Sequence, residues 1–241
     1  MRYAILSDIH GNLEALRAVL AAARDQADGF LCLGDVVGYG ADPQACLELI
    51  AERSLAVVGG NHEHAVAGLM SLRWFNPYAR AAAEWTRARL DDDHRAWLKA
   101  LPLVREVEDA TLVHASPAQP EEWDYLVSAE DGYAAFSAFA TRLCFVGHSH
   151  VPGTWVQGSW GRAHDPDAVK VTVEPGCRYI INVGSVGQPR DHDPRAAWAL
   201  WDVEARQVTR HRVSYEIGAA QGKIRAAGLP RFLADRLAEG R

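Results

Sequence analysis

The chain has 241 residues, a hydrophobic content of 49% and a formal net charge of −6 at pH 7. This content is enough for a substantial core, and the mildly acidic charge does not resemble the basic footprint of a nucleic-acid-binding protein. No apolar run approaches the length of a membrane span, and the N-terminus lacks the pattern of a signal peptide. We therefore expect a cytoplasmic globular protein.

The first half of the chain alternates strand and helix patterns. Asn12 is a suitable N-cap for one helix, and Asp42 followed by Pro43 opens another. In chain order the expected elements are strand 2–7, helix 13–24, strand 30–35, helix 44–53, strand 55–62 and helices at about 76–90 and 91–100.

The second half is richer in short apolar runs, and the C-terminus has a helical pattern from about Glu216. The expected strands are 103–107, 110–115, 143–150, 153–157, 168–173, 179–185, 196–203 and 206–213. Alternating strands and helices followed by hairpin-like strands indicate α/β layers with mixed sheets. We expect one domain over residues 1–241, because neither half has the pattern of a separate unit.

Five of the predicted strands end in side chains that carry oxygen or imidazole groups. These are Asp8 with His10, Asp35, Asn61 with His62 and Glu63, His114, and His148 with His150. Ligands of open α/β sheets bind at the carboxyl ends of the strands. Because residues two apart on a strand point to the same side, we expect each Asp-x-His or His-x-His pair to converge.

Order and context make this pattern specific, since a single short motif arises by chance. Asp92-Asp93-His94 repeats the Asp-x-His spacing but follows no strand, so we interpret it as a solvated helix N-terminus capped by Asp91. We expect His64 on a helix face or rim, His164 and His192 in solvated loops, and a structural role for Glu63.

Carboxylate, amide and imidazole groups are ligands of Mn, Fe, Zn, Ni or Co, and Mn is our preferred assignment. None of the four cysteines lies in these segments or forms a Cys-x-x-Cys pair. We expect them to be buried free thiols rather than metal ligands.

The ordered motifs resemble those of the calcineurin-like metallophosphoesterase superfamily, over roughly residues 3–203. The segments that carry the resemblance are SDIHGN (7–12), LGDVVGYG (33–40), GGNHEH (59–64), LVHASP (112–117), VGHSHVP (146–152) and NVGSVGQPRD (182–191). The last segment is similar to a loop of small single-domain bacterial and archaeal members. The resemblance implies a four-layer α/β/β/α sandwich, with two mixed sheets flanked by helices, and a two-metal site.

The resemblance also implies how the residues divide between two divalent ions. Asp8, His10 and His150 would bind the first metal, Asn61, His114 and His148 the second, and Asp35 would bridge the two. Two such metals clamp an in-line phosphoryl displacement and turn a bridging water into hydroxide near neutral pH. His62 is similar to a histidine near the leaving oxygen, where it would act as general acid or charge stabiliser, with Asp35 holding it.

Three further residues are candidates for binding the substrate phosphate. The helix that starts at Asn12 could offer backbone N–H groups to an anion, which is compatible with a simple N-cap role. Ser185 and Arg190 lie in the glycine-rich loop, but Arg190 could equally pair with Asp191 or Asp193. LGDVVGYG has no arginine, which weakens a close match to protein phosphatases and diadenosine tetraphosphate hydrolases and fits phosphodiesterase-like members better.

The aromatic segment 70–90 contains Trp74, Phe75, Tyr78 and Trp85. It could stack on a nucleobase, but a core or dimer-contact helix is the commoner explanation, and we favour it. The remaining tryptophans, Trp97, Trp123, Trp155, Trp160, Trp198 and Trp201, are expected to be packing residues.

The favoured function is a dimetal phosphoesterase that acts on a small phosphate ester, with a nucleotide as one option and diesters preferred over monoesters. A non-catalytic scaffold with the same fold is the alternative from another class, and it would be indicated by missing ligands. A nuclease is disfavoured because no basic stripe is evident. The substrate, the native metal and the oligomeric state stay open.

Overall fold

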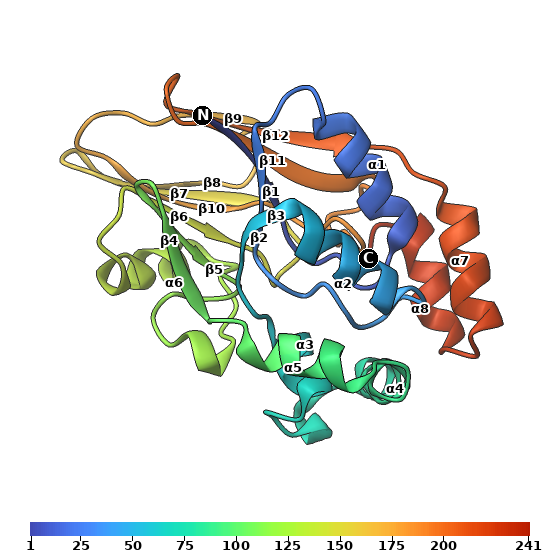
Figure 1. The fold of residues 1–241 in the computed structure, drawn as a ribbon. Coiled ribbons are helices and arrows are strands. Elements are labelled where there is room, and N and C mark those ends of the chain that lie inside the picture. The colour runs from blue at the N-terminus through green and yellow to red at the C-terminus, as the bar shows by residue number, and fades with distance from the viewer.

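The computed structural model describes residues 1–241 and contains two six-stranded β-sheets packed face to face (Figure 1). The first sheet has the strand order β3 (Ser54–Val57), β2 (Gly29–Cys32), β1 (Arg2–Leu6), β11 (Ala196–Asp202), β12 (Gln207–Val213) and β9 (Lys170–Thr172). β1 pairs in parallel with β2 and antiparallel with β11, so the sheet is mixed.

The second sheet is also mixed. Its order is β4 (Val104–Val107), β5 (Ala110–Val113), β6 (Leu143–Val146), β10 (Arg178–Asn182), β7 (Gly153–Gly158) and β8 (Gly161–Asp165). β5, β6 and β10 run parallel, and β10 pairs antiparallel with β7. The parallel strands are adjacent in each sheet, at one edge of the first (β3, β2 and β1) and in the middle of the second (β5, β6 and β10), which brings their carboxyl ends toward one edge of the sandwich.

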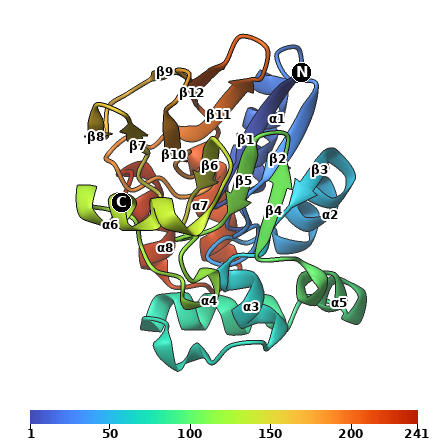
Figure 2. The same cartoon turned by 90° about the vertical axis from the view of Figure 1, so that its left-hand side faces the viewer.

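Helices cover the outer faces of the sheets and the edge beyond the strand ends. They are α1 (Leu13–Ala23), α2 (Pro43–Arg53), α3 (Asn61–Ala67), α4 (Pro77–Arg87), α5 (Asp92–Ala100), α6 (Ala129–Ala135), α7 (Ile217–Ala226) and α8 (Arg231–Asp235). α1 and α2 pack on the first sheet and α6 on the second, while α3, α4 and α5 lie together beyond the strand ends (Figures 1 and 2). The predicted α/β/β/α sandwich is therefore confirmed.

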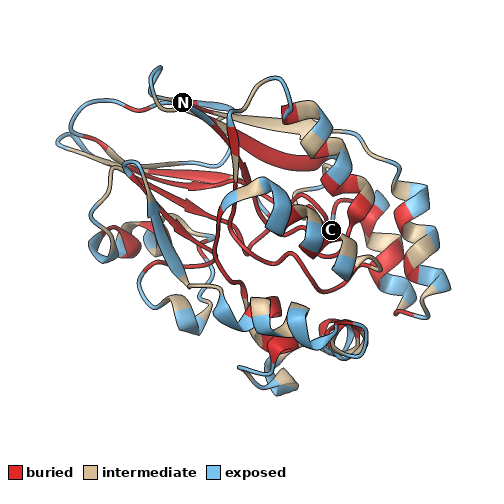
Figure 3. Ribbon diagram, in the orientation of Figure 1, coloured by how far each residue is buried: buried red, intermediate tan, exposed pale blue.

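The alternation of side chains along β1 shows how the layers are held together. Tyr3 and Ile5 point into the apolar core between the two sheets, whereas Ala4 and Leu6 point to the layer under α1 and α2. A strand buried on both faces reads as a continuous apolar run, as residues 3–6 of β1 do. Figure 3 shows that the central strands are buried along most of their length, whereas exposure concentrates on the outer helices, the loops and edge strands such as β4.

The C-terminal helices are tied to the first two helices by one cation. Lys223 of α7 lies 2.6 Å from Glu14 of α1 and 2.8 Å from the Asp42 carboxylate before α2. The predicted C-terminal helix is interrupted at Gly228-Leu229-Pro230, because proline cannot continue a helix.

The structure also differs from the sequence predictions in the second sheet. His164 lies in strand β8, not in a solvated loop, and its ring stacks on Trp155 at 4.7 Å between centroids. The helix α6 was not predicted. Of the tryptophans expected to pack in the core, Trp160 is exposed instead, at 65%.

All four cysteines are buried free thiols, as expected. No helix combines the length and apolar character needed to cross a bilayer. We infer that residues 1–241 form one domain, because each sheet is built from strands of both halves of the chain.

Candidate metal centre

Five loops at the carboxyl ends of the strands bring the sequence-predicted ligands together. The side chains of Asp8, His10, Asp35, His114, His148 and His150 are all buried there. Their ligand atoms form two groups of three, Asp8 with His10 and His150, and Asp35 with His114 and His148, and within each group the atoms lie within 4.8 Å of one another.

The reason expected for this convergence was wrong, however. β1 ends at Leu6 and β6 ends at Val146, so Asp8 and His148 lie beyond the regular strands. Asp8, His10, His148 and His150 have φ between 51° and 65°, in the left-handed region that non-glycine residues rarely adopt. Tight left-handed turns, not strand alternation, aim these side chains inward.

The first group of ligands is held at close range. His150 Nε2 lies 3.2 Å from Asp8 Oδ1, and His10 Nε2 lies 3.8 Å from the same oxygen. The two imidazole Nε2 atoms are 3.1 Å apart. In each ring the other nitrogen, Nδ1, faces a backbone carbonyl, of Val37 at 3.0 Å for His10 and of Gln188 at 2.6 Å for His150. Each ring is thereby oriented with Nε2 toward the shared point.

The second group is built in the same way. His114 Nε2 lies 3.3 Å from Asp35 Oδ2 and 3.1 Å from His148 Nδ1, while its own Nδ1 is 2.8 Å from the Leu33 carbonyl. Asp35 Oδ2 also lies 3.7 Å from His10 Nε2 in the first group. The Asp35 carboxylate therefore stands between the two groups.

Unsatisfied polar atoms indicate that cations fit this site. Asp8 Oδ1 and Asn61 Oδ1 are buried and have no hydrogen-bond partner. A buried carboxylate oxygen and amide oxygen without partners are costly unless something else binds them. The donor set of two carboxylates, one amide oxygen and four imidazoles matches divalent transition metals.

The electrostatics of the ligands follow from their shared burial. Burial alone would lower the pKa of His114, but the carboxylates of Asp35 and Asp8 outweigh burial and raise it to about 9. Burial lowers the pKa of His148 to about 3, and the nearby His114 adds to this effect. Burial would raise the pKa of Asp35, but the surrounding imidazoles, led by His114, hold it well below its usual range.

Glu63 fixes the loop that carries Asp35, which gives it the structural role expected from the sequence. Its buried carboxylate accepts hydrogen bonds from the backbone N–H groups of Asp35 at 2.6 Å, Gly60 at 2.8 Å and Val37 at 3.1 Å. A Cβ on Gly60 would lie 2.2 Å from Asp35 Oδ1, so the loop before α3 approaches the ligand closely only because residue 60 is glycine.

His62 lies at the edge of both groups. Its backbone N–H donates to Asp35 Oδ1 at 3.0 Å, and its buried ring packs against the rings of His10, Tyr39 and Phe75. Its ligand atom is also within 4.8 Å of those of His10 and Asp35. Burial lowers the pKa of His62 to about 4, so the ring is neutral near pH 7.

Two of the three residues expected to bind phosphate are occupied by backbone partners. Asn12 caps α1 through its Oδ1 and donates to the Gly187 carbonyl at 2.8 Å. The fully buried Ser185 hydroxyl donates to the Asp8 carbonyl and accepts from the Gln188 N–H, each at 2.8 Å. Both contacts favour roles in positioning the loops over direct contact with phosphate.

Arg190 is the third, and its surroundings differ. Its guanidinium donates to Gln188 Oε1 at 2.9 Å and lies 5.8 Å from the centre of the Tyr39 ring. The alternative partners considered for it, Asp191 and Asp193, pair with other arginines instead. Arg190 is thus a cation beside the metal centre with no carboxylate partner.

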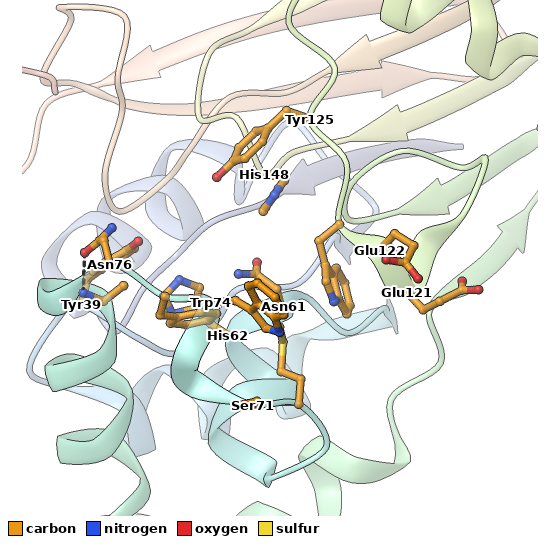
Figure 4. Close-up of a pocket in the computed structure, with 14 residues that line it drawn as sticks. Tyr39, Asn61, His62, Ser71, Trp74, Asn76, Glu121, Glu122, Tyr125 and His148 are labelled. Atoms are coloured by element: carbon orange, nitrogen blue, oxygen red, sulfur yellow. Dashed lines mark hydrogen bonds between the residues drawn. The ribbon is translucent and has the colours of Figure 1, made fainter.

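A cavity of about 620 Å³ opens next to the metal centre, within the range of small-molecule sites (Figure 4). Asn61, His62 and His148 line it on the side of the metal ligands. Tyr125 stacks on the ring of His148 at 4.1 Å between centroids, and Trp123 lies edge-on to His64 at 5.0 Å. His64 is half-buried, consistent with the rim position expected.

Sequence reasoning missed three of these cavity residues, although signals were present. Tyr39 lies inside the quoted segment 33–40, and Trp123 and Tyr125 follow the segment 112–117 within EEWDY. Trp123 was expected to be a packing residue, but it lines the cavity with φ of 61°.

The aromatic segment 70–90 divides into two parts. Trp74 is exposed and lines the cavity, which corrects our preference for a core or dimer-contact role at this position, whereas Phe75 lines the cavity and also packs against the apolar core. Tyr78 and Trp85 fit the packing interpretation, since Tyr78 stacks on Phe232 at 4.7 Å and Trp85 donates to the Ala227 carbonyl at 3.0 Å.

Comparisons with known proteins agree with the fold. The calcineurin-like phosphoesterase superfamily domain matches residues 1–206. An uncharacterized protein of Methanocaldococcus jannaschii is 38% identical over 243 residues, covering 99% of this chain and 98% of the relative. The crystal structure of a metallophosphoesterase from Sphaerobacter thermophilus is 44% identical, with a TM-score of 0.88 over 100% of this chain and 99% of that one. A hypothetical protein from Pyrococcus horikoshii has the same fold at 20% identity, with a TM-score of 0.81 over 100% of this chain and 98% of that one. The chain belongs to the calcineurin-like phosphoesterase superfamily.

Proposed function

We propose that this protein is a two-metal phosphoesterase that hydrolyses phosphodiester bonds, with phosphomonoesters as a secondary substrate class. The observation that carries the proposal is the pair of adjoining ligand groups, Asp8 with His10 and His150 and Asp35 with His114 and His148. Asp8 Oδ1 and Asn61 Oδ1 are also buried without a hydrogen-bond partner. Asp8, His10 and His150 would hold one ion, Asn61, His114 and His148 the other, and Asp35 both, with manganese as the preferred metal.

Two divalent ions in this position would lower the pKa of a shared water and stabilise negative charge on the phosphate oxygens. The protein residues supply the orientation. The backbone carbonyls of Val37, Leu33 and Gln188 fix the rings of three ligands, and Glu63 fixes the loop of Asp35. Because the ligands are held before any ion binds, little reorganisation is needed during reaction.

His62 is suited to stabilising charge on the leaving oxygen. Its ring is neutral near pH 7 in the free protein, because burial lowers its pKa to about 4. A neutral imidazole donates an N–H hydrogen bond but is too weak an acid to release that proton near pH 7, so charge stabilisation is favoured over general acid catalysis. An arriving anionic phosphate raises the pKa of a neighbouring imidazole, which would strengthen this contact.

Arg190 is the residue best placed to bind a phosphate oxygen from outside the metals. It is the cation beside the centre without a carboxylate partner, and its guanidinium lies over Tyr39 at the edge of the cavity. Arginine recognises phosphate through charge-assisted hydrogen bonds. It would supply the positive charge that LGDVVGYG, which has no arginine, does not provide.

The test is a paired assay on protein stripped of metal and reloaded with Mn²⁺. Hydrolysis of bis-p-nitrophenyl phosphate should exceed that of p-nitrophenyl phosphate. Asp35→Asn should lose bound metal and both activities, and Asp92→Asn is the matched control, because Asp92 is 98% exposed and pairs only with Arg95.

His62 needs a separate test, because its ring also lies within ligand distance of His10 and Asp35. His62→Ala should keep both metals and lose most turnover on a diester with a poor leaving group, whereas His94→Ala in α5 should change neither. Loss of one metal in His62→Ala would instead make His62 a ligand.

The scaffold alternative predicts a different outcome. Protein with two bound metals and no turnover on either ester would support a non-catalytic member of the superfamily. The complete ligand set disfavours this alternative, since a scaffold has no need to keep seven ligands.

A further inference from the structure

The cavity beside the metal centre has aromatic walls on a polar base. Its base is formed by Asn61, His62 and His148, so a phosphate bound at the metals would carry its organic group into this space. The aromatic residues Trp74, Phe75, Trp123 and Tyr125 are among those that line the other sides. The chemistry of these walls therefore bears on which ester the site accepts, and this inference rests on the proposed function.

Two features of the aromatic walls are suited to a planar group. Trp74 is 74% exposed although it borders the cavity, and the Arg73 guanidinium at 4.9 Å from its ring can cover one face only. Trp123 has a left-handed backbone, with φ of 61°, which costs free energy for a residue other than glycine. Such strained residues cluster at functional sites, where the strain orients a side chain. Exposed aromatic faces stack on planar ring systems in water, with little dependence on their exact pattern of substituents.

The polar groups at the cavity rim add a second requirement. Glu121 and Glu122 line the cavity, and neither carboxylate takes part in a hydrogen bond or an ion pair. The other polar groups of this wall are occupied, since Asn76 caps α4 and Ser71 accepts from the Arg73 N–H. Free carboxylates accept hydrogen bonds from amino groups and repel further phosphates.

We infer that the cavity binds a nucleobase that carries an exocyclic amino group, so that the substrate is a nucleoside phosphodiester with a single phosphate at the metals. The ring of the base stacks on Trp74, and its amino edge donates to Glu121 or Glu122. An additional phosphate chain is disfavoured, because it would extend toward two uncompensated carboxylates.

Binding measurements separate this inference from the proposed function, because they need no turnover. The probes are the 5′-methylenephosphonate analogues of AMP and UMP, whose P–C bond resists hydrolysis, and methylphosphonate, which has no base. Each is titrated calorimetrically into Mn²⁺-loaded protein. The adenosine analogue should bind about tenfold or more tighter than methylphosphonate, since stacking one base contributes about 1–3 kcal/mol.

Variants then locate the effect. In Trp74→Ala, the ratio between the affinities for the adenosine analogue and methylphosphonate should fall about tenfold. Trp160→Ala is the matched control, since Trp160 is 65% exposed at the turn between β7 and β8, and it should keep the ratio. The double change Glu121→Ala with Glu122→Ala, which removes both acceptors, should reduce the preference for the adenosine analogue over the uridine analogue.

Equal binding of the adenosine analogue and methylphosphonate by the unaltered protein would overturn the inference, as would an unchanged ratio in Trp74→Ala. Either result would leave the proposed phosphoesterase function intact. Conversely, an absence of turnover in the paired assay would remove the proposed function while the calorimetric preference for a nucleobase still stood.

Discussion

The proton on His114 gives a quantitative test of the metal centre. The carboxylates of Asp35 and Asp8 overcome the effect of burial and raise the pKa of His114 to about 9. At pH 7 the metal-free protein therefore carries a proton on this ring, and a metal ion has to displace it. Metal ligands bind in the deprotonated form, so binding should release that proton.

The size of the effect follows from the pKa. At pH 7 about one molecule in a hundred has a neutral His114. The affinity of the site that includes His114 for its metal should therefore be about 100-fold weaker at pH 7 than well above pH 9, a loss of about 2.7 kcal/mol in binding free energy. The sign is fixed, since the raised pKa favours the protonated, metal-free form at low pH. Affinity should rise about tenfold per pH unit between pH 7 and 9 and level off above it.

The other imidazole ligands provide the contrast. Burial lowers the pKa of His10, His148 and His150, so these rings are already neutral at pH 7 and should release no proton. His114→Gln keeps an oxygen that can bind a metal but has no titrating ring. The unaltered protein should thus release about one proton more than this variant at pH 7.

The assay is calorimetric titration with Mn²⁺ in buffers of different ionisation enthalpy. The slope of the observed binding enthalpy against the ionisation enthalpy of the buffer gives the number of protons released. If the unaltered protein and His114→Gln released the same number of protons at pH 7, the reasoning would be refuted. It would mean that His114 is neutral before metal binds, and that the Asp35 carboxylate does not hold a proton on it.

Four further predictions concern neighbouring groups. Glu63→Gln should weaken Mn²⁺ binding at least tenfold by calorimetry, because both carboxylate oxygens accept from backbone N–H groups and the amide NH₂ of glutamine cannot accept in place of one of them, whereas the exposed Glu84→Gln should not weaken it. Arg190→Ala should lower kcat/KM for a diester about 10- to 100-fold, the range expected for a charge-assisted hydrogen bond, with partial recovery in Arg190→Lys. Ser185→Ala should destabilise the protein by about 1–3 kcal/mol in urea unfolding, since it leaves the Gln188 N–H without an acceptor and removes one of the two hydrogen bonds to the Asp8 carbonyl. Removing metal with a chelator should lower the Tm, because each ion at a hundredfold excess over its Kd adds about 2.7 kcal/mol, and an unchanged Tm would mean that the ions do not bind the folded site.

The sequence allowed the layers and the ligands to be predicted because both depend on local patterns. Apolar strands followed by Asp8, Asp35 or His114 are visible in one dimension, and parallel strands place their ends at one edge. The turn geometry was not predictable in this way. Asp and His adopt a left-handed backbone more often than other non-glycine residues, but this weak preference does not single out positions in SDIHGN or VGHSH, so strand alternation was the natural and incorrect explanation.

The cavity was harder to predict than the metal centre for a related reason. Trp74 and Trp123 lie about fifty residues apart, outside the long helices and strands. In such segments hydrophobic periodicity does not predict the direction in which a side chain points. An aromatic residue in such a segment is a core residue or a binding residue depending only on tertiary packing. Tyr78 and Trp85, on helix α4, pack against the C-terminal helices, while Trp74, in the turn before it, does not.

The strained ligands link the stability of the fold to its chemistry. Five proposed ligands, Asp8, His10, Asp35, His148 and His150, have positive φ, and each such residue costs about 1–2 kcal/mol relative to an ordinary backbone. Backbone hydrogen bonds hold them, since the N–H of Asp8 donates to the Gly34 carbonyl and that of His10 to the Asp35 carbonyl. Strain of this kind persists only where the surrounding structure over-determines it. The dense loop contacts around the centre therefore do more than stabilise the fold. They keep the strained ligands pointing toward one another, so that an arriving ion binds to a preformed site.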